Sequence, residues 1–317
     1  MAGSHLADFI LKESSDSKIF GTKRWRSSLA NVKHLKDKIE LVDCNLMDGS
    51  AVIQTIERIK PDIVFHLAAQ SYVPESWRSP AATLTDNMMM QLNLLEAIRF
   101  SGLEPVIQLA CSSEEYGMVK EHELPINESN ELRPLSPYGV SKVTQDMMGY
   151  QYWASYGMKI IRTRTFNHEG PRRGEVFVTS NFAKQIAEIE LGLRDPVLKV
   201  GNLSAKRDWT DVRDIVRAYW LAVHHCNPGE AYVLASGQSR SIQELVDFLL
   251  SLSTKNIQIE LDPERLRPSD VPLLEGDSSK FRACTGWQPE YTFEQMIEDL
   301  LNYWRDRLRS TTADLRK

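Results

Sequence analysis

The stretch Asp62-Ile63-Val64-Phe65-His66-Leu67-Ala68-Ala69 is the strongest indicator of the fold. It is a short, nearly continuous apolar run, which is typical of a strand buried on both faces of a parallel sheet. Further strands of this kind are predicted at residues 19–22, 39–44, 105–111 and 159–165.

Amphipathic segments alternate with these strands. Helices are predicted at residues 3–13, 50–59, 83–100 and 138–156, and Pro61 follows the end of the second. In the first helix, Leu6, Phe9 and Ile10 share one face. Because strands and helices alternate, right-handed crossovers and a parallel sheet are expected. The sequence therefore predicts an α/β fold of the doubly wound, Rossmann-like kind.

The regular alternation of strands and helices becomes less clear after Phe166. Helices are predicted at residues 178–192, 241–252 and 293–309, with loops rich in Pro, Arg and Asp between them, and residues 212–233 are expected to return to the sheet. We predict a dinucleotide-binding domain of residues 1–166 plus about 210–235. Residues 167–209 and 236–317 would form a smaller substrate-binding lobe over the carboxyl edge of the sheet.

The chain begins almost at the first helix of such a fold. A strand and a glycine-rich turn normally precede that helix, and only Gly3 could be the last glycine of that turn. Either the sequence starts at an internal methionine of a longer chain, or the protein natively lacks the turn. We favour the first interpretation, because a central strand cannot be lost without leaving a gap in the sheet. As written, the chain is expected to bind a dinucleotide poorly, since the pyrophosphate lacks backbone donors.

The composition is that of an ordinary globular protein, with 42% apolar and 26% charged residues among 317. The net charge of −5 argues against nucleic acid and anionic membranes as main partners. No apolar run approaches the ~18 residues of a membrane span, and no signal-peptide pattern is present. A cytoplasmic protein is expected. The four cysteines, Cys44, Cys111, Cys226 and Cys284, lack metal-site spacing and are predicted to be free thiols, with no metal bound.

The run Ser136-Pro137-Tyr138-Gly139-Val140-Ser141-Lys142 carries the strongest chemical signal. Tyr138 and Lys142 lie four positions apart and share a helix face. An ammonium beside a phenol lowers the pKa of that phenol, which suits it to act as a base. This spacing alone is a weak signal. It becomes specific because an upstream strand ends in Cys111-Ser112-Ser113-Glu114-Glu115-Tyr116-Gly117, where a hydroxyl can bind the same substrate oxygen.

With these motifs the chain resembles the extended short-chain dehydrogenase/reductase family. Within it, the chain is most similar to the GDP-mannose 4,6-dehydratases and the GDP-4-keto-6-deoxymannose reductases. The resemblance covers residues 3 to about 305 and includes the runs at residues 66–71, 112–117, 133–138, 166–174, 201–209 and 267–271. It implies that Ser112 orients the C4 oxygen of a hexose and that Tyr138, tuned by Lys142, is the base at the C4 hydroxyl. Glu114 would move the C5 proton and assist loss of the C6 hydroxyl.

The cofactor is predicted to be NADP. After the second strand the chain has Lys23-Arg24-Trp25-Arg26-Ser27-Ser28, where an NAD enzyme would place an acid for the ribose. Guanidinium groups suit a 2′-phosphate. Together with the resemblance, this gives a cofactor site of Gly3, Arg24, Arg26, Ser27, Asn45, Leu46, Leu67, Ala68, Ala69, Gln70, Ser71, Tyr138, Lys142, His168 and Arg173.

The resemblance also implies a nucleotide-sugar substrate, a GDP-hexose. Lys184, Arg207 and Arg267 would face its diphosphate, and Asp270 could accept hydrogen bonds from guanine or its ribose. The full set is Ser71, Ser113, Asn167, Val178, Thr179, Lys184, Asn202, Arg207, Arg267 and Asp270.

Several functions stay open at this point. The favoured one is dehydration of GDP-mannose, in which hydride leaves C4 for NADP and returns to C6 after water is lost. Alternatives are an NADPH-dependent reductase of a 4-keto sugar, another nucleotide-sugar epimerase or dehydratase, and a non-catalytic relative without cofactor. The runs at residues 171–174 and 206–209 favour the dehydratase. The family implies a dimer or tetramer formed through the long helices at 83–100 and 138–156.

Overall fold

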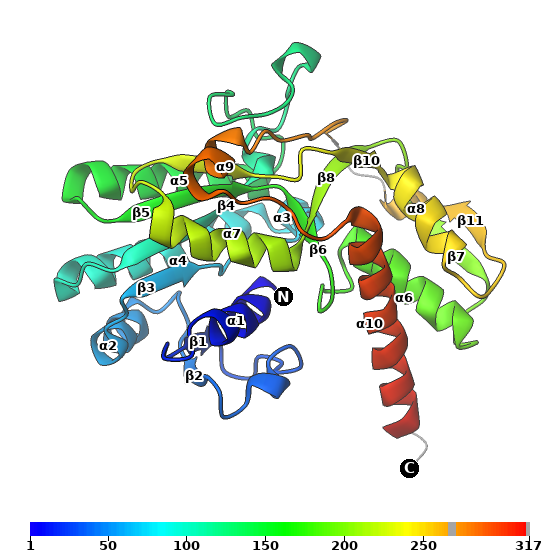
Figure 1. Ribbon diagram of the computed structural model, residues 1–317, viewed down its shortest axis with the longest axis horizontal. Helices are drawn as coiled ribbons and strands as arrows, with labels where there is room; N and C mark the ends of the chain where they lie inside the picture. Colours follow the sequence, from blue (N-terminus) through cyan, green and yellow to red (C-terminus); the bar gives the residue numbers. More distant parts are fainter. Residues whose placement is uncertain (266–270, 315–317) are drawn as a thin grey trace.

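The computed structural model describes residues 1–265 and 271–314. A sheet flanked by helices forms one part, and a lobe around the C-terminal helix forms the other (Figure 1). The central sheet is parallel, in the order β3 (Ile63–His66), β4 (Val106–Ser112), β5 (Ile160–Thr165) and β9 (Ala231–Leu234). The predicted α/β fold with parallel strands is confirmed. Residues 212–233 return to the sheet as expected, because β9 pairs with β5.

The parallel strands are divided between separate sheets, and a gap of this kind was expected where the first strand is absent. A second parallel pair, β1 (Phe20–Lys23) and β2 (Glu40–Asp43), is separate from the central sheet. No described strand precedes α1 (Ala2–Glu13), so one edge of β3 has no strand beside it. Ile63, Val64 and Phe65 are half-buried, although Val64 packs against the core on one face of the sheet and Phe65 packs against the core on the other face.

Helices cover both faces of the central sheet (Figure 1). On one side lie α2 (Gly49–Ile59), α4 (Pro80–Ser101) and α5 (Pro137–Tyr156). On the other side lie α1, α7 (Val212–His225) and α9 (Ser279–Thr285). Leu95 and Leu109 belong to the core under the first group, and Tyr219 and Leu234 to the core under the second. Burial of each such side chain contributes about 1.5–3 kcal/mol.

The start and end of α5 follow from its sequence. The Ser136 hydroxyl accepts a hydrogen bond from the Gly139 amide at 3.0 Å, and Pro137 occupies the first turn, where its missing N–H costs nothing. The helix ends at Gly157, whose φ of 70° is the left-handed conformation that glycine adopts readily. These signals fix where the helix starts, and therefore where Tyr138 and Lys142 lie.

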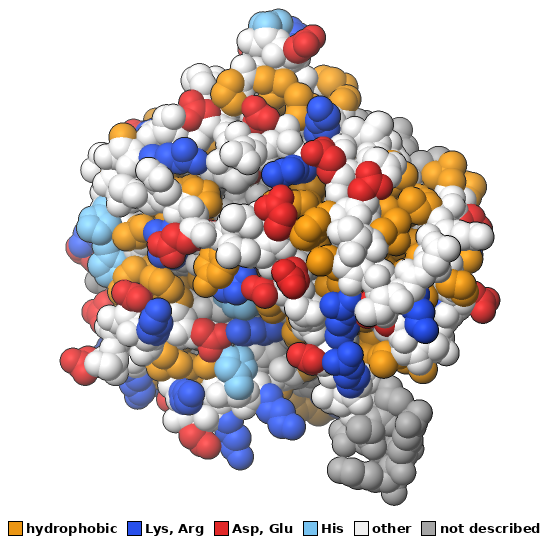
Figure 2. Space-filling view, turned by 45° about the vertical axis from the view of Figure 1, so that its right-hand side comes forward, with side chains coloured by type: hydrophobic (Ala, Val, Ile, Leu, Met, Phe, Trp, Pro, Cys, Tyr) orange, Lys and Arg blue, Asp and Glu red, His pale blue; other side chains and the backbone are white. Residues whose placement is uncertain are grey.

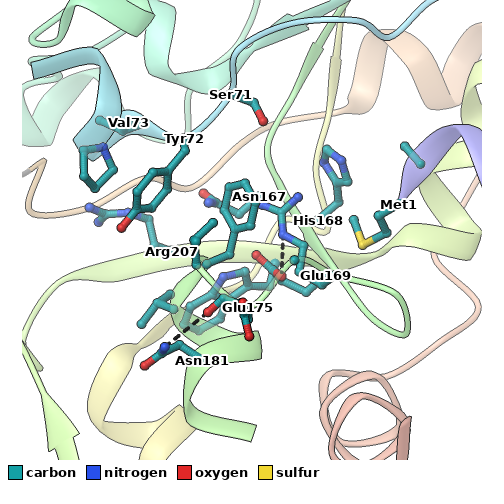
Figure 3. Close-up of a pocket in the computed structure, with 18 of the residues that line it drawn as sticks. Met1, Ser71, Tyr72, Val73, Asn167, His168, Glu169, Glu175, Asn181 and Arg207 are labelled. Atoms are coloured by element: carbon teal, nitrogen blue, oxygen red, sulfur yellow. Dashed lines mark hydrogen bonds and ion pairs between the residues drawn. The ribbon is translucent and has the colours of Figure 1, made fainter. Parts of the chain in front are cut away.

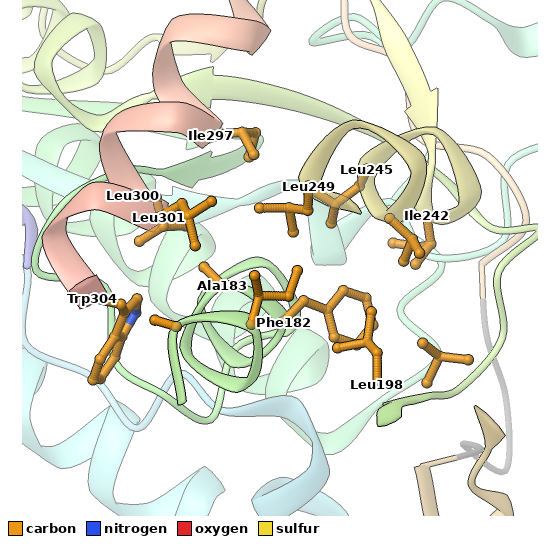
Figure 4. Close-up of a cluster of buried hydrophobic side chains, with 14 of the residues drawn as sticks. Phe182, Ala183, Leu198, Ile242, Leu245, Leu249, Ile297, Leu300, Leu301 and Trp304 are labelled. Carbon is orange, nitrogen blue, oxygen red and sulfur yellow. The ribbon is translucent and has the colours of Figure 1, made fainter. Parts of the chain in front are cut away.

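The lobe is built on α6 (Val178–Glu190), α8 (Ile242–Ser251) and α10 (Phe293–Asp314). Phe182, Leu249 and Leu301 are buried among them (Figure 4). This core is separate from those of the sheet, as a two-part division requires, and the domain boundaries themselves stay a prediction. None of the helices within the described ranges is long and apolar enough to cross a membrane. Acidic and basic side chains are interspersed over the face shown in Figure 2.

Several short elements were not predicted. Strand β8 (Lys206–Asp211) pairs with β6 (Asn167–Glu169) and β10 (Ser239–Ser241), and β7 (Val197–Val200) pairs with β11 (Gln258–Leu261). The remaining elements are α3 (Val73–Arg78), η1 (Lys33–Leu35), η2 (Ser113–Glu115), η3 (Glu121–Glu123) and η4 (Pro263–Arg265). Strands such as Asn167–Glu169 are only three residues long and polar, so they lack the apolar alternation by which a strand is recognised.

Candidate active site

A cavity of about 1440 Å³ lies where the carboxyl ends of β3, β4 and β5 face the lobe. Its walls come from segments far apart in the chain, including Met1 at the start of α1, Asn167 on β6 and Asn181 on α6 (Figure 3). Sites for one small ligand usually measure about 300–1,000 Å³. The cavity is therefore large enough for two ligands side by side.

The four predicted catalytic residues, Ser112, Glu114, Tyr138 and Lys142, all line this cavity. The first two lie where β4 passes into η2, and the last two lie in the first turns of α5. The two segments touch at Gly139, where a Cβ atom would lie 2.6 Å from the Glu114 carbonyl oxygen. Only glycine permits this approach, which brings the start of α5 against the end of β4.

The Tyr138 phenol is buried, and burial raises its pKa above the ordinary value. A hydrogen bond with Ser112 and the charge of Arg173 act in the opposite direction, and the charge of Glu114 adds to the rise. The Ser112 hydroxyl thus lies close to the phenol that the sequence predicts as the base.

Lys142 does not lie directly against that phenol. Its Nζ donates to the Ala110 carbonyl oxygen at 2.7 Å and lies 6.0 Å from the centre of the Tyr138 ring. Burial lowers the pKa of the Lys142 ammonium. The expected acidification of Tyr138 by its lysine neighbour is therefore corrected: here burial outweighs it, because the ammonium is turned toward the backbone of β4.

The N-terminus of α1 opens into the same cavity, which Met1, Ala2 and Gly3 all line. Burial, and then the charges of Arg173 and Arg172, lower the pKa of the Met1 amino group to about 6. A helix start with two nearby cations suits a phosphate anion, so these residues fit a dinucleotide. A Cβ at Gly3 would meet only Leu67 Cδ1 at 3.8 Å, an ordinary contact, so this position does not demand glycine.

The loop that contains Pro171 and Arg172 is hydrogen-bonded to α1 beside this helix start. Arg172 donates to Asp8 Oδ2 at 2.6 Å and to Ser4 Oγ at 3.0 Å, and a ring nitrogen of His5 lies 2.9 Å from the Pro171 carbonyl oxygen. Asn31 donates to the Arg172 carbonyl oxygen at 3.2 Å. These partners are more than 140 positions apart in the chain, so no local pattern could have predicted the contact.

Arg173, a predicted cofactor residue, lines the cavity beside a buried acid. Its Nε lies 3.1 Å from Glu169 Oε2 (Figure 3), and its guanidinium stacks 3.5 Å over the Phe177 ring. The Thr179 hydroxyl donates to the same Glu169 oxygen at 2.6 Å. Thr179 is fully buried and does not line the cavity. Its placement does not fit the predicted substrate contact, because its hydroxyl is already engaged.

Most of the other predicted residues also line the cavity: Gly3, Leu67, Ala69, Ser71, Ser113, Asn167, His168, Val178, Lys184, Asn202 and Arg207. The residues that the structure does not bring to it, besides Thr179, are Arg24, Arg26, Ser27, Asn45, Leu46, Ala68 and Gln70. Arg267 and Asp270 lie outside the described residues.

The predicted residues outside the cavity have identifiable local contacts. The side-chain oxygen of Gln70 accepts a hydrogen bond from the Tyr72 backbone N–H at 2.6 Å, and its side-chain nitrogen donates to Thr83 Oγ1 at 3.1 Å. Gln70 therefore holds the loop after β3. Arg24 and Arg26 are exposed on the loop after β1, with Arg26 stacked 4.4 Å over the Trp25 ring. The continuation of this loop does reach the cavity, through Ser28, Ala30 and Asn31.

Two predicted ligand contacts are already engaged within the protein. The Lys184 ammonium pairs with Glu175 and lies 3.5 Å from Glu188. These two acids compensate the positive charge that was predicted to face a diphosphate. His168 lines the cavity, and burial lowers its pKa to about 3, so its ring is neutral.

Some residues of the site were not predicted from the sequence. Tyr72 and Phe177 line the cavity edge to face, with ring centres 5.8 Å apart. Tyr72 directly follows the predicted run at residues 66–71, which is the one signal that could have suggested it. Behind the predicted catalytic residues, Glu115 and Asp146 are buried beside Arg164 of β5.

Comparisons with known proteins agree with this geometry. The family model described as GDP-mannose 4,6 dehydratase matches residues 1–300. A GDP-mannose 4,6-dehydratase of Yersinia enterocolitica is 34% identical over 339 aligned positions, which cover 94% of this chain and 90% of that protein. A GDP-6-deoxy-D-mannose reductase of Pseudomonas aeruginosa is 36% identical over 249 positions, covering 78% and 82%. The solved structure of RMD from P. aeruginosa complexed with NADPH is similar with a TM-score of 0.82 and 31% identity, covering 92% of this chain and all of that one.

Proposed function

The chain belongs to the GDP-mannose 4,6-dehydratase family, and from that premise we propose that it converts GDP-mannose to GDP-4-keto-6-deoxymannose and water. The observation that supports this most is the shared cavity. Ser112, Glu114, Tyr138 and Lys142 line it together with the N-terminus of α1. A base, an acid and an anion-binding helix start are the parts that this reaction requires.

NADP is the proposed cofactor. The start of α1, with Arg172 and Arg173 beside it, would hold the pyrophosphate, and the exposed Arg24 and Arg26 would reach a 2′-phosphate. Leu67, Ala69, Ser71 and His168 line the intervening wall, and Ser27, Asn45, Leu46, Ala68 and Gln70 stay predictions. When bound, NADP supplies the site that takes hydride from C4 of the hexose and returns it to C6.

The chain's own groups manage the protons. We propose that Tyr138 takes the proton of the C4 hydroxyl while Ser112 holds the C4 oxygen, since both residues line the cavity and lie close together. Glu114, on the same wall, then removes the C5 proton that the ketone acidifies and returns a proton to the leaving C6 hydroxyl. Lys142, fixed to the Ala110 carbonyl, contributes a positive charge close to the reacting atoms.

Ser71, Ser113, Asn167, Val178, Lys184, Asn202 and Arg207 are the proposed substrate contacts within the cavity, and Arg267 and Asp270 remain proposals by motif position. We further propose a cytoplasmic enzyme that forms a dimer or tetramer through α4 and α5. Exposed apolar side chains on these helices support that surface: Phe100, Val140, Met147 and Tyr150.

The test offers GDP-mannose to the purified chain with a catalytic amount of NADP. The expected product is the 4-keto-6-deoxy sugar, formed without net consumption of NADPH, because the hydride returns to the sugar. Tyr138→Phe is the control and should lower kcat by about 10²–10⁴-fold, the usual contribution of a general base. Calorimetry with NADP accompanies the assay, since failure to bind it would favour a non-catalytic relative.

The reductase is the second candidate, because the similar P. aeruginosa protein carries that name and the matching solved structure holds NADPH. A reductase would leave GDP-mannose untouched and would oxidise NADPH when given a 4-keto sugar. Glu114→Gln separates the two chemistries within this chain. It should abolish elimination, which needs a carboxylate, and near-normal dehydration by this variant would refute the role of Glu114.

A further inference from the structure

Glu115 is a fully buried acid directly beside the catalytic wall. Its Oε1 accepts a hydrogen bond from the Ser112 amide at 2.7 Å, while the Ser112 hydroxyl accepts one from the Glu114 amide at 3.2 Å. These reciprocal bonds form a capping box that closes the single turn η2. The turn in which Ser112 and Glu114 lie therefore depends on the Glu115 carboxyl group.

The side chains of this turn point in two different directions. Ser112, Ser113 and Glu114 line the cavity, whereas Glu115 does not and is directed into the protein. Its acceptor oxygen thus fixes the backbone from behind, while the groups that would meet the substrate point forward. A shift of about 1 Å in such groups can cost about 10²-fold in rate.

The second Glu115 oxygen faces a buried layer of charges. Oε2 lies 3.7 Å from Arg164 Nε, which donates to Asp146 Oδ2 at 2.8 Å. Asp146 also binds Arg162, and it follows Lys142 by one turn on α5. The residues that carry Ser112 and Lys142 therefore rest on one polar layer, which joins the end of β4 to α5.

Packing alone does not explain a carboxyl group here. Within the described residues, Glu115 Oε2 is buried without a hydrogen-bond partner, and apolar side chains are usually equal or better than buried charges for stability. Burial, followed by the charge of Asp146, raises the pKa of Glu115 well above its usual range. A neutral acid at this position accepts from Ser112 without the full cost of a buried charge.

We propose, on the basis of the proposed function, that Glu115 is a positioning residue for the reaction. Its buried carboxyl group holds the Ser112 amide and so aims the Ser112 hydroxyl and the Glu114 carboxylate into the cavity. The property that matters is an acceptor oxygen at the distance from the backbone that a glutamate or glutamine side chain reaches. Negative charge is not required.

Two variants of Glu115 separate length from charge. Glu115→Gln keeps an acceptor at the same reach and imitates the neutral acid, so kcat for dehydration should stay within about threefold of the parent. Glu115→Asp keeps the carboxyl group but withdraws it from the Ser112 amide, and kcat should fall by about 10–10²-fold. KM for GDP-mannose and the Kd for NADP should change by less than threefold in both variants.

Glu244→Gln and Glu244→Asp are the matched controls. Glu244 occupies the same capping-box position at the start of α8, with the Ser241 amide 2.7 Å from its Oε2, and it does not line the cavity. Neither control variant should change kcat by more than about twofold. If Glu115→Asp keeps kcat within twofold, or if Glu115→Gln loses more than tenfold while Glu115→Asp does not, the proposal is overturned.

Amide hydrogen exchange at Ser112 provides a readout that needs no turnover. The parent and Glu115→Gln should protect this amide, and Glu115→Asp should expose it while the amides of β4 stay protected. Equal protection in all three proteins would contradict the proposal even if the parent did not dehydrate GDP-mannose. Conversely, a parent inactive on GDP-mannose but with the expected exchange pattern counts only against the proposed function.

Discussion

Tyr138 is the proposed base, and its environment should affect the rate of the proposed reaction. Because burial raises the pKa of its phenol, only a small fraction is ionised near neutral pH. Each rise of one pH unit below that pKa increases the ionised fraction about tenfold. The rate should therefore climb with pH.

We expect kcat/KM for dehydration to keep rising between pH 7 and 9, without a plateau below pH 8.5. A pH–rate profile of the parent protein measures this, with NADP saturating at every pH. A plateau beginning near pH 7 would mean that another group, such as the ammonium of Lys142, lowers the pKa of the phenol in the working complex.

The cysteines make a second prediction for single residues. Cys284 is exposed, whereas Cys44, Cys111 and Cys226 are buried, and burial raises the pKa of the Cys111 thiol. One thiol per chain should react quickly with a disulfide reagent under native conditions, and four should react in guanidinium chloride. Cys284→Ser should remove the fast reaction, and a fast reaction that survives in this variant would contradict the burial order.

The sequence predicted which residues would line the cavity together better than it predicted their contacts. A fixed spacing on one helix was enough to pair Tyr138 with Lys142, because helical periodicity is a local property. The bond from Lys142 to Ala110 and that from Thr179 to Glu169 depend on side-chain orientation. Glu115 gave no signal, because an acid beside a predicted catalytic acid is indistinguishable in sequence from a solvated one.

Among the elements, the connection between α7 and β9 is tightly constrained at Gly229. Gly229 has a φ of 85°, its carbonyl oxygen accepts from Arg162 Nη2 at 2.8 Å, and a Cβ there would lie 2.2 Å from the Trp153 ring. Both the backbone conformation and the space exclude a side chain. Trp153 belongs to α5, so this turn also packs against that helix.

Gly229→Ala should lower the free energy of unfolding by about 3 kcal/mol, from about 1 kcal/mol of backbone strain plus overpacking. Gly102→Ala is the matched control, since Gly102 has a φ of 67° and a methyl group added there would meet no atom within 4 Å. It should cost only about 1 kcal/mol. Urea unfolding of both variants decides this, and equal losses would show that the Trp153 contact is unimportant.

Apolar elements were predicted closely, and polar ones were missed. The strand predicted at 105–111 differs from β4 by one residue at each end, and the helix predicted at 138–156 differs from α5 only at its first residue, because apolar pattern and caps both mark them. Strands β6 and β10 gave no such pattern. Pairing with β8 creates them, and pairing partners cannot be read from three polar residues.

For the molecule as a whole, buried histidines make stability depend on pH. Burial lowers the pKa of His66 to about 3. Below pH 6.5 the unfolded chain takes up a proton that the folded chain refuses, so this residue reduces stability as pH falls. The reduction is about 1.4 kcal/mol per pH unit and extends down to the folded pKa.

His66→Gln should remove this contribution. Relative to the parent, the free energy of unfolding of the variant should improve by about 2 kcal/mol between pH 7.5 and pH 5. Using the difference between two proteins cancels the many carboxyl groups that titrate in the same range. His122→Gln, at an exposed position, should show no such improvement, and a parallel response of the two variants would disprove the assignment.

The residues of the cavity wall come from two different parts of the molecule. Ser112, Glu114, Tyr138 and Lys142 come from β4 and α5, while the opposite wall is supplied by the lobe, including Phe177, Asn181 and Arg265. Under the proposed function, replacing residues of the lobe should change which sugar or base is recognised, while the proposed proton-handling residues stay unchanged. A chimaera that borrows only residues 175–207 from a relative with another preference would inherit that preference and keep its own chemistry.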